Sequence, residues 1–325
     1  MMDLGKQIGL INGQPTRNAF GDALCELGQS RPNIVVVDGD VANSTRTEYF
    51  AAAFPERFFN VGIAESNLIG VASGLAACGK EVVASSFAVF LLGNAYEQIR
   101  MGIAFPQLNV KLVGSHSGIS IGEDGPSQMG IEDIALATSL PHFMVLVPAD
   151  GPSTRAATVA MFNHEGPVYL RTGRIKVPVI YPETVPFVPG QANELRAGRD
   201  VTVIACGLMV AAALEAAHHL HQIGIDARIL DMHTIKPIDE TAIRRAAQET
   251  GALITAEEHL LEGGLGAAVA RVVVEHQPVP MAMVGLHNQY AESGPPEALL
   301  QKYHLTPQAI VEAAHTVLAR KPKNN

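Results

Sequence analysis

The sequence predicts an α/β protein in which a doubly wound, mostly parallel sheet is followed by a smaller α/β domain. Near-continuous runs of Val, Ile and Leu, such as NIVVVDGD and EVVASSF, alternate with amphipathic stretches of helical length. This alternation is typical of parallel sheets covered by helices on both faces. The chain has 325 residues, more than the ~250 residues that one core usually serves. A proline-rich stretch, KVPVIYPETVPFVPG, separates two such regions.

These observations divide the chain into two domains and a linker. The first domain is expected over residues 1–175, with the strands NIVVVDGD, RFFNVGI, EVVASSF, NVKLVGSH, FMVLVPA and PVYLRTG. A linker is expected over 176–198, because its prolines fix the backbone and remove hydrogen-bond donors. The second domain is expected over 199–325, with the strands DVTVIACG, IDARILDM, ALITAEEH and MAMVGLH.

Composition excludes several classes of partner. A net charge of -9 without a cluster of Lys and Arg argues against nucleic acid and anionic membranes. No apolar run reaches about 18 residues, and the amino terminus does not resemble a signal peptide. Cys25, Cys78 and Cys206 form no CxxC pair, so no disulfide framework or zinc site is expected. We expect a cytoplasmic protein that binds small molecules or proteins.

Ligands bind such sheets at the carboxyl ends of the strands, and chemically informative side chains follow several of them. Glu65 lies between RFFNVGI and the small-residue helix LIGVASGLAACG. It is either an acid favoured by the dipole of a helix first turn, or a buried carboxylate that shares a proton with a bound base. Phe87 and Phe90 follow EVVASS and either pack in the core or stack on a flat ring.

The stretch HSGISIGEDGPSQMG, residues 116–130, follows the strand NVKLVG. His116 supplies a base, Asp124 an acceptor and Gln128 a mixed donor and acceptor. An ordinary long loop with a capping acid is the alternative. Polar loops of this length in compact domains are more often functional than plain connections.

Two arginines, Arg171 and Arg174, follow the strand PVYL. Guanidinium groups at the open end of a sheet can bind phosphate or carboxylate through two hydrogen bonds. The alternative is a solvated basic edge.

Two other signals carry no function. EGGLGAAVA, residues 262–270, has Val269 where a dinucleotide-binding motif ends in Gly or Ala, so it is interpreted as the start of a helix. His218, His219 and His221 lie on one expected helix at a spacing that cannot bring all three to one metal. We expect no metal site within this chain.

Taken in order, the motifs GIAESN, SSFAVF, HSGISIGEDGPSQ and VYLRTGR, followed by a proline-rich linker and DARILDMHTIKPID, resemble the carboxyl-terminal two-thirds of transketolase. The likeness runs from about residue 15 to the end, and GEDGP with a preceding His is its most specific part. The chain resembles deoxyxylulose-phosphate synthase and the β subunit of 2-oxo-acid dehydrogenase E1 less closely. All of these families use thiamine diphosphate, so the resemblance implies a pyrimidine-binding first domain.

The resemblance implies a role for each candidate residue. Glu65 matches the glutamate that hydrogen-bonds N1' of the cofactor aminopyrimidine, and it is the expected catalytic residue together with His116. Phe87 and Phe90 match the aromatic pocket around the pyrimidine ring. The remaining matches place Asp40 near the cofactor, His116 and Asp124 on the sugar hydroxyls, and Arg174, Arg17 and Ser44 on the substrate phosphate, with Arg171 as the second choice for Arg174.

Two departures from the family pattern matter. Gln128 stands where transketolases commonly have a second histidine, which affects donor recognition. The motif GDG, followed further on by Asn, that holds the diphosphate and Mg²⁺ is absent, as is the domain that would carry it. The resemblance therefore implies a split enzyme in which a separate amino-terminal subunit holds the diphosphate and Mg²⁺, in an α2β2 assembly.

The expected activity is transfer of a two-carbon ketol unit from a ketose phosphate to an aldose phosphate. One alternative is an E1 β subunit that acts on a 2-oxo acid, and GEDGP with His116 argues against it. The other is a non-catalytic binding or regulatory homologue, and the intact Glu65 argues against that.

Overall fold

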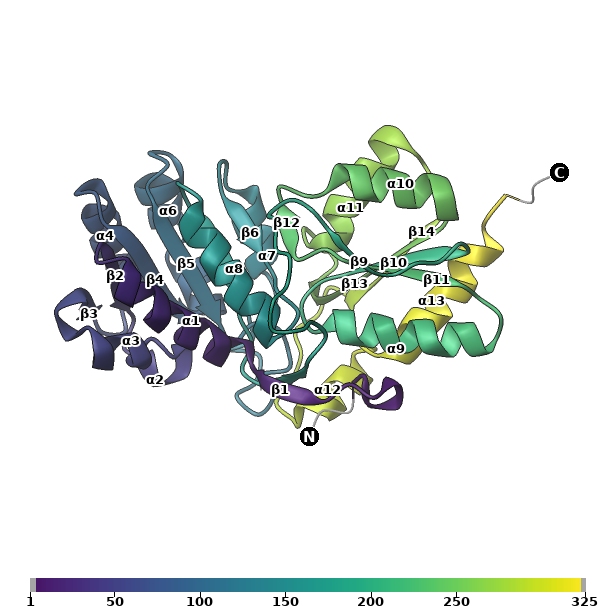
Figure 1. Ribbon diagram of the computed structural model, residues 1–325, viewed down its shortest axis with the longest axis horizontal. Helices are drawn as coiled ribbons and strands as arrows, with labels where there is room; N and C mark the ends of the chain where they lie inside the picture. Colours follow the sequence, from purple (N-terminus) through teal and green to yellow (C-terminus); the bar gives the residue numbers. More distant parts are fainter. Residues whose placement is uncertain (1–3, 323–325) are drawn as a thin grey trace.

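The computed structural model describes residues 4–322, in which two large sheets lie side by side, each between layers of helices (Figure 1). The first sheet has seven strands in the order β12-β6-β7-β5-β4-β2-β3, and the second has five in the order β14-β13-β10-β11-β9. Neighbouring strands are parallel except for the pairs β12–β6 and β11–β9. The predicted α/β class, with two mostly parallel sheets, is confirmed.

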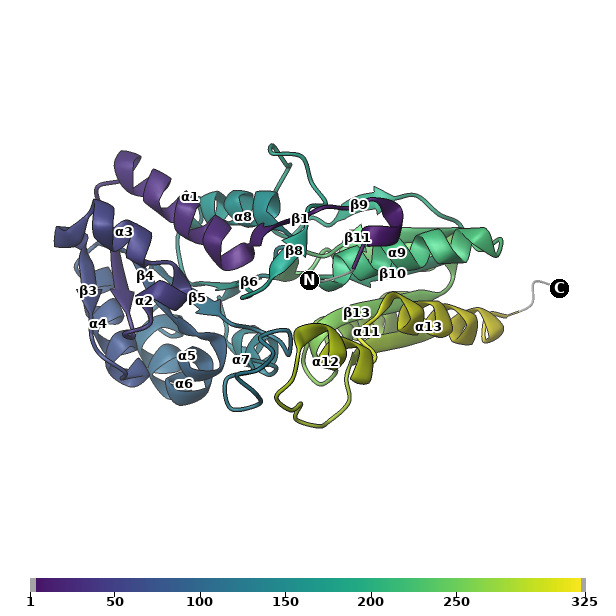
Figure 2. The ribbon, with the colours of Figure 1, turned by 90° about the horizontal axis from the view of Figure 1, so that it is seen from below.

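Helices cover both faces of the first sheet (Figure 2). Its strands are β2 (Ile34–Asp38), β3 (Phe58–Asn60), β4 (Glu81–Phe87), β5 (Val110–Ser115), β6 (Met144–Leu146), β7 (Val168–Arg171) and β12 (Thr234–Lys236). One face carries α1 (Thr16–Ser30), α3 (Glu48–Ala53) and α8 (Gly151–Asn163); the other carries α4 (Glu65–Ala77), α5 (Ala88–Asn94), α6 (Tyr96–Ile99) and α7 (Asp133–Ser139). Val36 faces the first group and Val35 the second, so a strand buried on both sides is apolar throughout.

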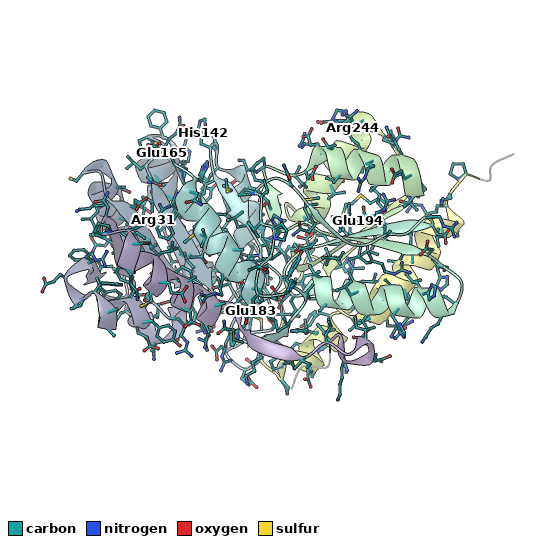
Figure 3. The ribbon with its side chains drawn as sticks, in the orientation of Figure 1. Arg31, His142, Glu165, Glu183, Glu194 and Arg244 are labelled. Atoms are coloured by element: carbon teal, nitrogen blue, oxygen red, sulfur yellow. The ribbon has the colours of Figure 1, made fainter. Side chains whose placement is uncertain are left out.

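The second sheet is built in the same way. Its strands are β9 (Asn193–Arg196), β10 (Val201–Ala205), β11 (Ala227–Asp231), β13 (Leu253–Leu260) and β14 (Met281–Leu286), and its helices are α9 (Met209–Gln222), α10 (Glu240–Thr250), α11 (Leu265–His276), α12 (Pro296–Lys302) and α13 (Pro307–Ala319). The edge strand β9 carries Glu194, which lies below α10 (Figure 3). Its carboxylate pairs with Arg245 at 2.5 Å and lies 3.9 Å from Arg228. These charges cover the exposed edge of the sheet.

Short elements connect the larger ones. They are α2 (Ala42–Thr45), the single turns η1 (Lys6–Ile8) and η2 (Pro55–Arg57), and a π-helical turn, η3 (Arg100–Ala104). The glycine-rich stretch EGGLGAAVA starts α11, as predicted: the Leu265 and Gly266 amides at its first turn donate to the buried carboxylate of Glu257.

The proline-rich segment differs from the prediction of a plain linker over 176–198. It contains β8 (Lys176–Pro178), which pairs with β1 (Asn12–Pro15), and β9, which joins the second sheet. Between them the chain is irregular and held from both domains: the Asp150 carboxylate accepts the amides of Ile180 and Tyr181, and the Tyr181 hydroxyl donates to Asp231 at 2.6 Å. Strands therefore form within this segment despite its prolines.

The two domains also share structure. β12 follows the expected start of the second domain at 199 yet pairs with β6 of the first sheet. One apolar cluster runs from Val37 and Leu68 of the first domain to Ile204 and Leu230 of the second. The domains therefore pack as one body. Within residues 4–322, no helix combines the length and apolar character needed to cross a membrane.

We expect Asp231→Asn to change how stability depends on pH. Burial raises the pKa of Asp231 from its ordinary 3.8 to about 7. Since the folded chain then retains this proton to a higher pH than the unfolded chain, the carboxyl stabilises the fold less as pH rises from about 4 to about 7. Asparagine does not titrate, so its contribution to stability does not change over this pH range.

Urea unfolding at several pH values checks this. The free energy of unfolding of the variant minus that of the natural chain should rise across the window, by at most about 1.4 kcal/mol per pH unit. A difference that stays constant with pH would contradict the assignment.

Candidate active site

Glu65 begins α4 beside the carboxyl end of β4. The residue is 7% exposed, and its Oε1 accepts a 3.1 Å hydrogen bond from the Ser86 hydroxyl. The turn after β2 also comes close, because a Cβ on Gly39 would lie 3.4 Å from the Ser86 oxygen. The hydrogen bonds of residues 4–322 include no protein donor to Glu65 Oε2. The carboxylate is thus largely removed from water and keeps one oxygen for a bound group.

The aromatic pair lies at the end of β4 and the start of α5. Phe87 and Phe90 are half-buried and near parallel, with ring centroids 6.0 Å apart. The Phe87 ring also stacks on the His116 imidazole at 3.9 Å. Phe87 therefore supports the His116 ring.

His116 is a buried, neutral imidazole. Its backbone has a φ of +59°, and its Nδ1 lies 2.6 Å from the Ser115 hydroxyl. Nε2 is 3.3 Å from Arg17 Nη1. Since a guanidinium only donates, Nε2 is the acceptor, which assigns the ring proton to Nδ1. Burial, followed by the charges of Arg17, Arg174 and Arg46, lowers the His116 pKa to about 3.

The charges of three guanidinium groups act on this imidazole. Arg17 donates to the Ser44 carbonyl at 2.8 Å, and its pKa is lowered to about 10, first by burial and then by Arg46 and Arg174. Its Nε is buried without a partner among residues 4–322. Arg46, which the sequence analysis missed, is held by Asn18 at 3.1 Å and by the Glu48 carboxylate at 3.0 Å. Like charges this close favour an anion between them.

Asp38 holds the turn that presents Ser44 and Arg46. This buried carboxylate accepts hydrogen bonds from the Val41 amide at 2.7 Å and from the hydroxyls of Thr45 and Thr47 at 2.9 and 2.8 Å. The sequence carries the signal for this turn, because an Asp at the end of a strand followed by Ser and Thr is typical of side chains that bond the local backbone. It does not reveal where the following arginine points.

Arg174 lies at the rim, with 36% of its side chain exposed. Its Nη1 donates to the Ile121 carbonyl at 2.6 Å and lies 3.6 Å from Glu123 and 3.7 Å from Asp124. The loop of residues 116–130 and the predicted phosphate arginine therefore meet. Asp124 and Arg174 form an ion pair.

Arg171, the second choice for binding the substrate phosphate, is buried within the protein. Its side chain is 7% exposed and forms a two-point ion pair with Asp133, at 2.7 and 3.2 Å. It also donates to the carbonyls of Gly130 and Glu258 at 3.0 Å. Arg171 Nε and Nη2 are thus occupied by partners inside the protein. Arg174 remains the candidate.

The other predicted residues lie nearby. Asp40 is exposed and accepts a 2.7 Å hydrogen bond from the Asn60 side chain, whose Oδ1 accepts the Gly62 amide three residues before Glu65. Ser44 is half-buried on α2. Gln128 is half-buried and accepts a hydrogen bond from the neighbouring Ser127 hydroxyl.

Metal ligands do not gather in the part of the chain that the structure describes: it holds no group of three or more His, Cys, Asp or Glu side chains able to bind an ion. His218 and His221 are exposed on α9 and His219 is half-buried.

The chain matches two described domains over most of its length. Residues 12–179 match the transketolase pyrimidine-binding domain, and residues 190–310 match the transketolase C-terminal domain. The chain belongs to the transketolase family. Membership implies dependence on thiamine diphosphate, and it agrees with the resemblance drawn from GEDGP and Glu65.

Relatives of similar length support this. A putative transketolase C-terminal section from Methanocaldococcus jannaschii is 42% identical over 310 residues, which cover 94% of this chain and 96% of that one. The 6-deoxy-6-sulfo-D-fructose transketolase subunit SqwH of Clostridium sp. is 41% identical, covering 94% and 95%. A solved structure described as a split gene transketolase, inactive beta4 tetramer, has a TM-score of 0.90 and 49% identity, covering 95% and 100%. In this family, then, such a polypeptide occurs as a separate subunit.

We expect His116 to stay neutral between pH 5 and pH 8, because burial and the neighbouring guanidinium charges disfavour its protonated form. NMR of chain labelled with ¹³C-histidine, with His116→Gln to assign the signal, should show a resonance that does not shift over that range. An inflection near pH 6.5 in the assigned signal would contradict the assignment.

Proposed function

We propose that this chain is the smaller subunit of a two-chain transketolase and that it transfers a two-carbon ketol unit from a ketose to an aldose only with its partner. The observation that carries the proposal is the buried carboxylate of Glu65, which has one oxygen without a protein donor among the described residues. Such a carboxylate can share a proton with a bound base. The E1 and non-catalytic alternatives gain no support from the relatives described above.

The residues of the site fit the pyrimidine half of thiamine diphosphate. Glu65 would hold a proton at N1' of the aminopyrimidine, and its burial strengthens that hydrogen bond. Phe90 would supply an apolar wall for the ring, whereas one face of Phe87 is already covered by His116. When bound, the cofactor supplies the carbon nucleophile that cleaves a bond next to a carbonyl.

The diphosphate and Mg²⁺ belong to the partner chain. The sequence contains no GDG, and Mg²⁺ on a diphosphate needs oxygen ligands from protein. The related structure described as an inactive beta4 tetramer is in keeping with a subunit that is inactive without its partner. An α2β2 assembly in the cytoplasm is the arrangement that we propose; three free cysteines fit that reducing compartment.

The substrates that we propose are sugars with an anionic tail. Arg17, Arg46 and Arg174 would bind the tail, while neutral His116 and Asp124 would bind hydroxyls. Guanidinium forks suit phosphate, and a sulfonate presents the same three oxygens. One relative is named for a sulfo-sugar, so both tails belong in a substrate screen with the partner subunit.

We expect Glu65→Gln to leave the fold intact and to lower turnover by about 100-fold or more, the scale of losing a positioned acid or base. Glutamine preserves the acceptor for Ser86 but cannot share a proton with a bound base in the same way. Turnover is measured with the partner subunit, thiamine diphosphate and Mg²⁺.

Ser66→Ala is the matched control, because Ser66 is exposed on the same first turn of α4. The control should retain nearly full turnover. Full turnover in the Glu65 variant would refute the role of Glu65, whereas inactivity of the natural pair would refute the transketolase assignment itself.

We expect Arg174→Ala to raise KM for a phosphorylated or sulfonated sugar by about 10- to 100-fold, the scale of one charge-assisted hydrogen bond. KM for the uncharged sugar should change little. Arg100→Ala is the control, since Arg100 is exposed and pairs with Glu97 on the same helical segment. Equal effects on charged and uncharged sugars would contradict an anion-binding role.

A further inference from the structure

The loop of residues 116–130 is covered by the C-terminal domain. Ile119 and Ile121 are fully buried and belong to the same apolar cluster as Val203 of β10 and Met209 of α9. A loop packed in this way takes its position from the second sheet as well as from the strand that precedes it. Gly118, Gly122 and Gly125 of this loop face residues of the C-terminal domain.

Glu258 of β13 contacts the loop backbone directly. Its Oε1 accepts a 2.6 Å hydrogen bond from the Ser120 amide, and the residue is 5% exposed. A Cβ at Gly118 would lie 2.2 Å from the Glu258 carboxyl carbon, and Gly118 has a φ of +79°. Glycine is therefore required here by both the contact and the backbone. A cavity of about 30 Å³, with room for about one water, lies beside these groups.

The turn that Glu258 holds also orients Arg174. Ser120 precedes Ile121, whose carbonyl accepts the 2.6 Å hydrogen bond from Arg174 Nη1. Two and three residues further on, Glu123 and Asp124 lie within 4 Å of the same guanidinium. If the turn moves, the carbonyl and the guanidinium move with it. Displacements of about 1 Å in a binding site can cost about 100-fold in rate.

Two further contacts tie the loop to the same domain. Arg171 Nη2 binds both the Gly130 carbonyl at the end of the loop and the Glu258 carbonyl on β13, at 3.0 Å each. At the tip, added Cβ atoms on Gly122 and Gly125 would lie 2.9 Å from Pro296 and 2.3 Å from the Ser293 hydroxyl. The middle of the loop depends on Glu258, because its carboxylate is the side chain that accepts the Ser120 amide.

We propose that Glu258 is a positioning residue for substrate binding: through the Ser120 amide it fixes the turn 118–121, and so the place of Arg174 and Asp124. The C-terminal domain thereby takes part in the active site without contacting the substrate. The inference rests on the proposed function, because it assigns the substrate anion to Arg174.

The first experiment needs no activity. Hydrogen–deuterium exchange of the full chain should show faster exchange in peptides covering 117–122 in Glu258→Ala, by about tenfold or more, because the Ser120 amide loses its acceptor. Glu258→Gln retains the acceptor oxygen and should restore protection. Glu257→Gln is the matched control, since the neighbouring carboxylate binds the Leu265 and Gly266 amides of α11 instead.

The second experiment uses the complete enzyme with its partner subunit. Glu258→Ala should raise KM for an anionic sugar by about 10- to 100-fold and change kcat less than about threefold, with a small effect on the uncharged sugar. Glu258→Gln should behave like the natural enzyme. A purely structural role would lower kcat for both sugars and lower the unfolding midpoint instead.

If Glu258→Ala does not fold, Gly118→Ala serves as the second variant, because its added Cβ displaces the same turn. Unchanged exchange in 117–122 in every folded variant would overturn the positioning role. Changed exchange together with an unchanged KM would overturn the link to Arg174. If the natural pair shows no ketol transfer, the proposed function fails, and the exchange data still decide whether Glu258 holds the turn.

Discussion

The arrangement of the two domains depends on one buried ion pair, between Asp133 and Arg171. Its oxygens and nitrogens are 2.7 and 3.2 Å apart, and Tyr169 donates a third hydrogen bond to the carboxylate at 2.6 Å. Burial alone would raise the pKa of Asp133, but the charge of Arg171 brings it below its ordinary value. Charges removed from water are tolerated only with such complete pairing. Because Arg171 also binds carbonyls of the loop and of β13, the pair joins α7, β7, the loop and the second sheet at one point.

A second feature is the concentration of cations around a neutral imidazole. After burial, the charges of Arg46 and Arg174 lower the pKa of Arg17, and all three guanidinium charges lower that of His116. Each is held by a carbonyl or a carboxylate of the protein, so their positions do not depend on a ligand. This prearrangement means that an anion entering the site does not have to order three flexible side chains. His116, kept neutral, accepts a hydrogen bond from Arg17 without adding a fourth charge.

The C-terminal domain is attached to the first domain at several points. It contributes β12 to the first sheet, shares an apolar cluster with it, and covers the loop of residues 116–130. The proline-rich segment is fixed between the domains by Asp150 and Asp231. A second sheet held in this way is a rigid support for the loop packed against it.

The sequence by itself determined the fold class, both parallel sheets, and the set of motifs from Glu65 to Arg174, because apolar runs and residues after strands are local signals. It also contains no GDG motif. Tertiary structure alone decided which arginine is buried: Arg171 and Arg174 are three residues apart, yet one pairs with Asp133 and the other reaches the rim. It likewise brought Arg46 and Glu258 to the site. Such contacts join segments far apart in the chain, so no local pattern records them.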